Sequence, residues 1–254
     1  MKRNIYRLSA LTVALFLLSF TFPAHKIKVY LIGDSTLSKK EVKAYPETGW
    51  GMPFSIFFNQ EVEVDNRAQN GRSTKSFLAE GRWTPVADSL QQGDYVFIQF
   101  GHNDEAKEKL ERYTPIADYK TNLLKFISET RLKKATPVLI TPVSRRKFDA
   151  QGQVMETHKG YSEMVKEVAK EENVPVIDLD EKSRELYQKL GPENSKLLFN
   201  QLAPGVHPNY PNGQQDNTHF NELGAREIAQ IVLAEIKALH LDLANYIVQR
   251  PVKK

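Results

Sequence analysis

The stretch Lys28–Thr36 reads KVYLIGDST and joins an apolar run to a glycine, an aspartate and two hydroxyl side chains. Residues 28–32 are rich in β-branched and aromatic side chains, which is typical of a buried strand. Gly33 and the polar residues after it are typical of a turn, so the strand should end there. The stretch therefore predicts a strand whose carboxyl end presents Ser35. The position of this serine raises the question of its function.

Strand and helix patterns alternate along the rest of the chain. This alternation predicts a three-layer α/β/α sandwich with a central, mainly parallel five-stranded sheet. The 254 residues suffice for one sizeable α/β core, and because no internal linker interrupts them we expect one domain over residues 25–254. The expected strands are Lys28–Ile32, Glu61–Asn66, Tyr95–Phe100, Pro137–Thr141 and Pro175–Asp178, and the expected helices are Trp50–Asn59, Thr114–Lys134, Thr157–Glu172 and Asn221–His240.

The amino terminus has the pattern of an export signal. Three basic side chains and no acidic one accompany the uncharged apolar stretch Leu8–Phe22, which predicts a signal peptide over residues 1–24 with cleavage near Ala24. At 15 residues the stretch is shorter than the roughly 20 that a membrane span needs. We therefore expect a secreted or periplasmic protein without stable membrane association after cleavage. An uncleaved anchor is the alternative, because Phe22 is bulky where a small residue is preferred.

The charge of the expected mature chain argues against a nucleic-acid partner. The whole sequence carries a formal charge of +4 and a pI near 9.0, but three of its bases lie in the predicted signal peptide. Without them 32 basic residues face 31 acidic ones, so the domain is nearly neutral. The sequence contains no cysteine, which excludes disulfides, cysteine nucleophiles and thiolate metal sites.

Polar and glycine-rich segments follow the first three expected strands. Ser35 follows the first strand, Asn66–Thr74 (NRAQNGRST) the second and Gly101–Asp104 (GHND) the third. Ligands of open α/β sheets bind beyond the carboxyl ends of the strands, so these segments should meet at one rim. The segment Asp216–Phe220 (DNTHF) precedes the last expected helix, and one turn would present its aspartate and histidine together. Before it, Ala203–Asn217 is rich in Pro, Gly and Asn and predicts a long surface loop.

The residue types at this rim suit acyl transfer. A serine hydroxyl needs a general base to become a nucleophile, and His219 can accept the proton of Ser35. Asp216 can bind the other ring nitrogen, hold the tautomer and stabilise the imidazolium. Negative charge on a tetrahedral intermediate needs preorganised donors, which the N–H groups of Ser35 and Gly71 and the amide of Asn103 can supply. Glycine at position 71 leaves room for the acyl oxygen.

Together these motifs resemble those of a known family. GDS at 33–35, Gly71 within NGRST, GHND at 101–104 and DNTHF at 216–220 match the four blocks of the SGNH (GDSL-type) hydrolases. The resemblance spans about residues 27–240, nearly the whole expected mature chain. The details GDST, GRSTKSF and FGHND look closest to the rhamnogalacturonan acetylesterase branch, which removes acetyl groups from pectin backbones. The chain lacks the GxSxG elbow of the ordinary α/β-hydrolases.

This resemblance implies a flavodoxin-like SGNH fold and a secreted serine esterase that deacetylates rhamnogalacturonan or pectin through an acyl-enzyme. It assigns the triad to Ser35, Asp216 and His219 and the oxyanion hole to Ser35, Gly71 and Asn103. The expected partner is an acetylated polysaccharide or oligosaccharide, and we expect a monomer that needs no cofactor and no metal. The alternatives are an acetylesterase for another polysaccharide such as xylan, a small-ester lipase, a non-catalytic carbohydrate-binding protein and a flavodoxin-like phosphate-binding domain.

Three further residues are candidates for substrate contact. Arg72 adjoins Gly71, and His207 lies in the long loop beside the triad segment. Trp83 could stack on a sugar ring, although core packing is the default for tryptophan. It belongs to the segment 81–86 (GRWTPV), which we cannot place in the family pattern. The run Arg145–Lys147 follows the fourth strand and faces the same rim, where it could hold uronate carboxylates.

The remaining histidines near the motifs have structural interpretations. His102 stands next to Asn103, where we favour a supporting role over a catalytic one, and His158 lies near a helix start and is expected at the surface. The rival hypothesis is a metal site, whose ligands would be His102, Asp104, Asp216 and His219. No close-spaced pair of histidines supports it, and the triad already explains two of the four, Asp216 and His219.

Overall fold

The central feature of the fold is a sheet of five parallel strands. The computed structural model describes residues 26–248, so the expected signal peptide at 1–24 lies outside the described residues. The strand order is β2-β1-β3-β4-β5. Every strand expected from the sequence is confirmed, with each end within one residue of its expected position. The strands are β1 (Ile27–Gly33), β2 (Val62–Asn66), β3 (Tyr95–Gln99), β4 (Thr136–Ile140) and β5 (Val176–Ile177).

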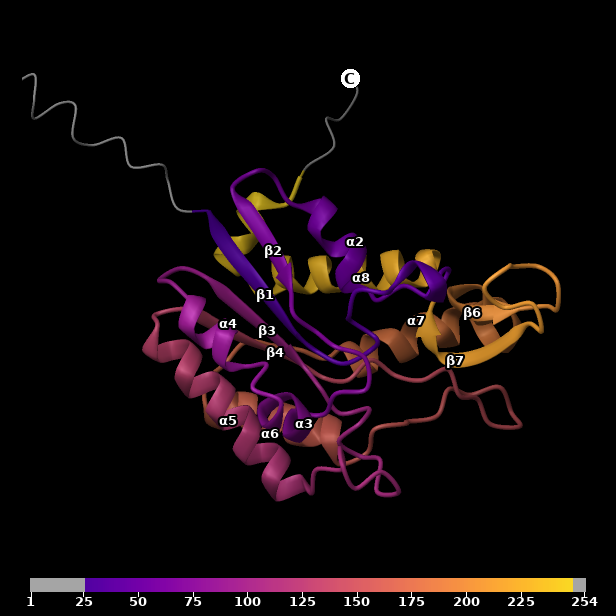
Figure 1. The fold of residues 1–254 in the computed structure, drawn as a ribbon, viewed down its shortest axis with the longest axis horizontal. Helices are drawn as coiled ribbons and strands as arrows, with labels where there is room; N and C mark the ends of the chain where they lie inside the picture. Colours follow the sequence, from indigo (N-terminus) through magenta and orange to yellow (C-terminus); the bar gives the residue numbers. More distant parts are fainter. Residues whose placement is uncertain (1–25, 249–254) are drawn as a thin grey trace, which may run out of the picture.

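Helices cover both faces of this sheet, which confirms the expected α/β/α layers (Figure 1). One layer contains α2 (Gly51–Phe54), α7 (Leu179–Asn194) and α8 (Glu222–Ala238). The other contains α3 (Thr74–Ala79), α4 (Thr84–Ser89), α5 (Ile116–Leu132) and α6 (Tyr161–Glu171). Short 3-10 helices are η1 (Val42–Ala44), η2 (Ser55–Phe57), η3 (Ser195–Leu198) and η4 (Asp242–Tyr246).

Strand β1 is buried on both faces because its alternate side chains enter two separate cores. Val29 and Leu31 pack in the core that α2, α7 and α8 cover. Tyr30 and Ile32 pack in the core on the other face of the sheet. All four side chains are at most 1% exposed. This burial explains why the strand reads as a continuous apolar run instead of an alternating one.

One expected helix is shorter than the sequence predicts. Instead of a single helix over Trp50–Asn59, α2 gives way to η2 and then to an extended Phe58. Phe58 forms a β-bridge with Ile247, so pairing with a distant segment accompanies the end of the helix. Local periodicity cannot reveal such a partner. The sequence patterns also left α3, α4 and α7 unassigned.

A β-hairpin stands beside the central sheet, at the end where β1 finishes (Figure 1). Its strands are β6 (Phe199–Leu202) and β7 (Gln214–Phe220), which pair antiparallel. The expected loop over Ala203–Asn217 is confirmed as far as Gly213, but its last four residues belong to β7. A second, two-stranded sheet was therefore missing from the sequence prediction.

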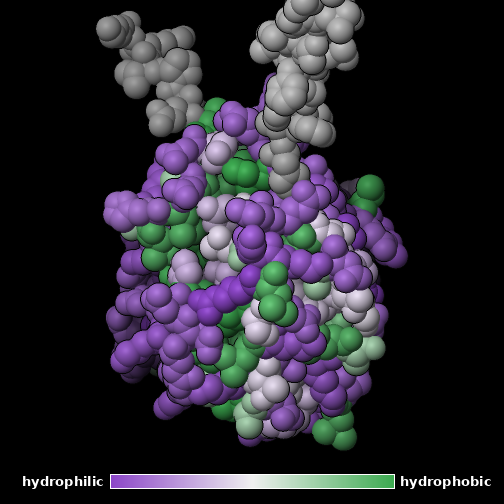
Figure 2. Space-filling view, turned by 90° about the vertical axis from the view of Figure 1, so that its left-hand side faces the viewer, coloured by the Kyte–Doolittle hydropathy of each residue, from purple (hydrophilic) through white to green (hydrophobic). Residues whose placement is uncertain are grey.

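Figure 2 shows the opposite end of the molecule, where β1 begins. The surface there is mostly hydrophilic, and its apolar residues form small groups separated by polar ones. Small groups of this kind are ordinary on protein surfaces. Within residues 26–248, no helix combines the length and the apolar character that crossing a membrane requires. The residues singled out for chemistry lie at the other end of the strands.

Candidate active site

Ser35 sits in a tight turn directly after β1. The Oδ1 atom of Asp34 accepts hydrogen bonds from the main-chain N–H (2.9 Å) and the hydroxyl (2.8 Å) of Thr36. The carbonyl oxygen of Asp34 accepts from the N–H of Ser38 at 3.1 Å and closes the turn. Burial raises the pKa of the Asp34 carboxyl, and the two Thr36 bonds oppose that shift. The aspartate of the GDS block thus shapes the turn that presents Ser35.

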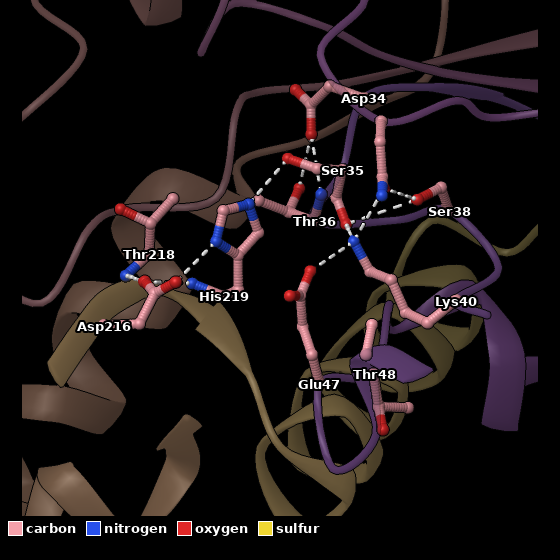
Figure 3. Close-up of polar contacts among 12 residues, drawn as sticks. Asp34, Ser35, Thr36, Ser38, Lys40, Glu47, Thr48, Asp216, Thr218 and His219 are labelled. Atoms are coloured by element: carbon pink, nitrogen blue, oxygen red, sulfur yellow. Dashed lines mark hydrogen bonds and ion pairs between the residues drawn. The ribbon is translucent and has the colours of Figure 1, made fainter. Parts of the chain in front are cut away.

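His219 joins Ser35 to Asp216 (Figure 3). Its Nε2 lies 2.9 Å from Ser35 Oγ, and its Nδ1 lies 2.7 Å from Asp216 Oδ2. Since an ionised carboxylate only accepts hydrogen bonds, Nδ1 carries the proton and Nε2 presents its lone pair to the serine. Burial favours a raised pKa for Asp216, but hydrogen bonds from the His219 ring and from the N–H groups of His219 and Thr218 outweigh it and lower the pKa.

A bulge in β7 brings Asp216 and His219 to the same place. Residues three apart in a regular strand point to opposite faces. Here Phe220 pairs with Phe199 and Gln215 with Gln201, so four residues of β7 bulge opposite a single residue of β6. Asp216 Oδ1 accepts from the N–H groups of Thr218 (2.7 Å) and His219 (2.9 Å), which makes the bulge a turn. The expected turn exists, but it interrupts a strand instead of leading directly into α8.

Hydrogen bonds attach the bulge to β6 and to the loop that follows β4. Gln201 of β6 donates from Nε2 to the carbonyl oxygen of Asp216 at 2.7 Å. Arg146, which follows β4, donates from its main-chain N–H to the carbonyl oxygen of Asn217 and from Nη1 to its Oδ1, both at 2.8 Å. The sequence suggested that Arg146 could bind a uronate in the cavity. In the structure it instead holds the triad segment and does not line the cavity.

A cavity of about 550 Å³ opens beside the triad. Ser35, Gly71, Asn103 and His219 all line it, so the structure brings together the predicted nucleophile, base and oxyanion donors. Gly71 has a φ of +75°, a conformation that favours glycine. A Cβ atom there would also lie 3.3 Å from Nη1 of Arg112. The glycine is thus needed for its backbone conformation and for close packing, in addition to the space for an acyl oxygen that the sequence suggested.

Asp104 anchors the GHND block. Its Oδ1 accepts from the N–H (2.9 Å) and hydroxyl (2.6 Å) of Thr74 at the start of α3, and its Oδ2 accepts from the N–H of Gly101 at 3.1 Å. Burial raises the pKa of Asp104 to about 7, opposed by the Thr74 bonds. Asp104 therefore ties the segment carrying Asn103 to the segment carrying Gly71.

Sequence reasoning missed a buried ion pair behind Ser35. The Nζ atom of Lys40 lies 2.7 Å from Oε1 of Glu47 and donates to the carbonyl oxygen of Ser35 (2.5 Å) and to Oδ1 of Asn70 (2.8 Å) (Figure 3). The Lys40 side chain is 2% exposed. Burial lowers its pKa and the charge of Glu47 opposes that shift. Two adjacent lysines after GDST look like a solvated turn, so the sequence held no signal for this pair.

His102 and His158 form a buried pair beside the cavity. Nε2 of His158 lies 3.2 Å from Nδ1 of His102. Burial lowers the pKa of each ring well below its ordinary value, and the charge of Arg145 adds to the effect. His158 is fully buried, so its expected place at the surface is wrong. Among residues 26–248 no group of three His, Asp or Glu side chains could hold a metal ion.

Trp83 is a core residue and not a sugar platform. Its side chain is 2% exposed and packs edge-on against Phe126 of α5 at 5.0 Å between ring centroids. The indole N–H donates to the carboxylate of Glu129, also on α5. The segment 81–86 leads into α4, with Trp83 at the position before its first residue. The candidate substrate contact at Trp83 is therefore wrong, because packing against α5 leaves no free ring face.

The other two candidate substrate contacts, Arg72 and His207, do not line the cavity. The guanidinium of Arg72 pairs with the carboxylate of Glu80 at 3.0 Å. The carbonyl oxygen of Arg72 accepts from Asn103, and its Nη1 donates to the carbonyl oxygen of Asn70 at 2.8 Å, so Arg72 supports two residues of the wall. His207 lies in the hairpin loop, with its ring 5.6 Å from that of Tyr45. The cavity wall instead contains Glu47, His102, Glu105, Lys109, Arg112 and Arg145, none of which was singled out as a substrate contact except Arg145.

The chain matches a known family model over most of its length. The model of the GDSL-like Lipase/Acylhydrolase family aligns with residues 31–226, which include all four motif blocks. The chain belongs to this family. This GDSL-like hydrolase is accordingly a carboxylic ester hydrolase, and the resemblance inferred from its motifs is confirmed.

Several curated proteins are similar to this GDSL-like hydrolase. Rhamnogalacturonan acetylesterase RhgT of Bacillus subtilis is 44% identical over 228 residues, which cover 90% of this chain and 97% of the relative. The probable rhamnogalacturonan acetylesterase YesY of the same organism is 38% identical, with 87% and 97% covered. A rhamnogalacturonan acetylesterase of Emericella nidulans is 29% identical, with 89% and 91% covered.

Solved structures confirm the fold of this GDSL-like hydrolase. Protein YxiM of Bacillus subtilis superposes with a TM-score of 0.74 at 24% identity, covering 87% of this chain and 58% of that one. Axe2, an acetylxylan esterase from Geobacillus stearothermophilus, superposes with a TM-score of 0.57 at 19% identity, covering 88% and 97%. At these identities the likeness concerns the fold alone.

Proposed function

We propose that this protein is a secreted serine esterase that removes acetyl groups from rhamnogalacturonan. The observation that carries the proposal is the continuous contact from Ser35 through His219 to Asp216, at 2.9 and 2.7 Å. These distances suit a nucleophile, a general base and the carboxylate that orients it. The relatives at 44% and 38% identity, named for rhamnogalacturonan, support a carbohydrate acetylesterase.

In the proposed mechanism Ser35 Oγ attacks the acetyl carbonyl while its proton passes to Nε2 of His219. Asp216 stabilises the imidazolium that forms. The N–H groups of Ser35 and Gly71 and the amide of Asn103 bind the oxyanion, where preorganised donors lower the barrier. His219 then protonates the departing sugar alkoxide, which leaves an acetyl-serine. Water, activated by the same imidazole, attacks that ester, and collapse of the second intermediate returns acetate and the serine hydroxyl.

The composition of the cavity wall favours a short acyl group on a polar substrate. Ala106 is the only residue of the wall with an aliphatic side chain, so within the described chain this cavity has no apolar channel for a long acyl chain. The same wall carries three basic side chains, Lys109, Arg112 and Arg145, and three acidic ones, Glu47, Glu105 and Glu108, and Arg145 is paired with Glu105. Attraction of a galacturonate carboxylate would therefore be local, at a single basic side chain such as Lys109, and would not come from a net positive wall. Activity should therefore fall steeply from acetyl to butyryl to octanoyl esters of 4-nitrophenol.

Acetate release from a panel of acetylated polysaccharides tests the proposal. Wild type should release acetate from rhamnogalacturonan faster than from acetylxylan, and Ser35→Ala should release it several orders of magnitude more slowly. An organophosphate should add its mass to Ser35 in wild type and to nothing in the variant. Full activity of Ser35→Ala would refute the serine mechanism, and a preference for acetylxylan would refute the substrate. The amino-terminal sequence of protein from the culture medium tests export and cleavage near Ala24.

A further inference from the structure

Two contacts orient the side-chain amide of Asn103. Nη1 of Arg112 donates to its Oδ1 at 2.9 Å. Its own Nδ2 donates to the carbonyl oxygen of Arg72 at 3.0 Å. If the amide rotated by half a turn, its oxygen would face the Arg72 carbonyl and its NH₂ would face the guanidinium. Both contacts would then be repulsive, so the orientation of the amide follows from its partners.

We propose that Arg112 is a positioning residue for the oxyanion hole, acting through Asn103. The amide has two N–H bonds, and the Arg72 carbonyl accepts one of them, which leaves the second for the cavity that Asn103 lines. A cation on the amide oxygen also draws electron density from the NH₂ group, so that second N–H becomes a stronger donor. The inference rests on the proposed function, because it requires Asn103 to bind the oxyanion.

The place of Arg112 in the fold supports this role. Its main-chain N–H donates to the carbonyl oxygen of Lys109 at 3.0 Å, within the segment that follows Asn103. Its side chain is 25% exposed and lines the cavity. Nη1 also lies over Gly71, since a Cβ atom there would be only 3.3 Å away. One guanidinium nitrogen therefore adjoins two of the three proposed oxyanion donors, and it reaches the second because residue 71 has no side chain.

A double-mutant cycle on a small neutral ester tests the inference. Arg112→Met keeps much of the aliphatic stem and removes both the charge and the donors. With 4-nitrophenyl acetate, which has no uronate to attract, Arg112→Met should lower kcat about 10- to 100-fold with KM changed less than about threefold. This is below the roughly 10²–10³-fold cost of losing an oxyanion donor outright, which we expect for Asn103→Ala. In the Asn103→Ala background, Arg112→Met should cost less than about threefold, because residues that act through one another are not additive.

Matched controls separate this role from general support of the loop. Lys75→Ala removes another cationic contact to the same segment, from Nζ to the carbonyl oxygen of Leu110 at 2.9 Å, and should leave kcat unchanged. Arg112→Lys should recover part of the lost kcat, since it restores a charge and a donor. Organophosphate labelling of Ser35 counts the competent sites, so that every kcat refers to folded enzyme.

Two results would overturn the inference. Equal costs of Arg112→Met in the two backgrounds would show that Arg112 acts independently of Asn103, and an effect confined to KM would make it a substrate contact. In either case Ser35 would still be labelled and Ser35→Ala would still be inactive. Failure of the inference is therefore distinguishable from failure of the proposed function, which would appear as an unlabelled serine.

Discussion

Replacing Lys40 with methionine should destabilise the protein more than the same replacement of an exposed lysine. The Nζ atom of Lys40 has three oxygen partners, one each from Ser35, Glu47 and Asn70, and the side chain is 2% exposed. Removing one partner of a buried ion pair typically costs about 3–5 kcal/mol, because the other charge remains buried and unpaired. The Glu47 side chain is 17% exposed and borders the cavity, so water can reach it. We therefore expect the lower end, about 3 kcal/mol.

Thermal unfolding followed by tryptophan fluorescence measures this cost. Trp50 and Trp83 are at most 2% exposed, so their emission reports loss of the native core. For a domain of this size, about 3 kcal/mol corresponds to a fall in Tm of roughly 6–12 °C. The same variant should lower kcat, because Lys40 joins the turn of Ser35 to the residue before Gly71.

The double variant Lys40→Met/Glu47→Gln is the control. It removes the stranded carboxylate, so it should be more stable than Lys40→Met alone although it carries one more substitution. The reasoning is refuted if Lys40→Met melts within about 2 °C of wild type. It is equally refuted if the two substitutions destabilise additively.

Three further predictions concern the site and the core. Gly71→Ala should cost about 1–3 kcal/mol by urea unfolding, since φ is +75° there, and should also lower kcat on 4-nitrophenyl acetate. The pKa of Asp216 is lower in the folded protein than its ordinary value near 3.8. Its ionised carboxylate therefore stabilises the fold at pH values above 3.8, and this stability is lost as the pH falls through the lower native pKa. The Tm of wild type should therefore fall more steeply than that of Asp216→Asn between about pH 5 and pH 2, and parallel curves would contradict this. Trp83→Ala should cost about 3–5 kcal/mol while leaving KM for the polysaccharide unchanged, whereas a raised KM with intact stability would restore the sugar platform.

The parts of the fold that follow from local chemistry were predictable. The apolar run of β1 and the polar residues after it determine both the strand and the partly exposed position of Ser35 just beyond its end. The same reasoning placed Gly71 and Asn103 at the rim, because parallel strands end at one edge of a sheet. These three residues with His219 line one cavity in the structure.

What could not be predicted depends on partners far away in the sequence. Core packing is the default for Trp83, but its loop-like sequence context left the sugar platform open, and the packing of its ring against Phe126 decides for the core. His158 is buried beside His102, which lies 56 positions earlier in the sequence. The strand character of the segment with Asp216 depends on β6, since its own composition is that of a loop. In each case a long-range contact outweighs the local preference.

The bulge in β7 makes the position of Asp216 and His219 independent of the loop of their own hairpin. Its two anchors, Gln201 and Arg146, hold the segment of Asp216 and His219 from within the hairpin stem and from the rim of the central sheet. Neither anchor belongs to the hairpin loop at 203–213. That loop can therefore change in length and composition without moving the base away from the serine. The hairpin therefore combines a stem, whose geometry fixes the contact between His219 and Ser35, with a loop that does not line the cavity and is free of that constraint.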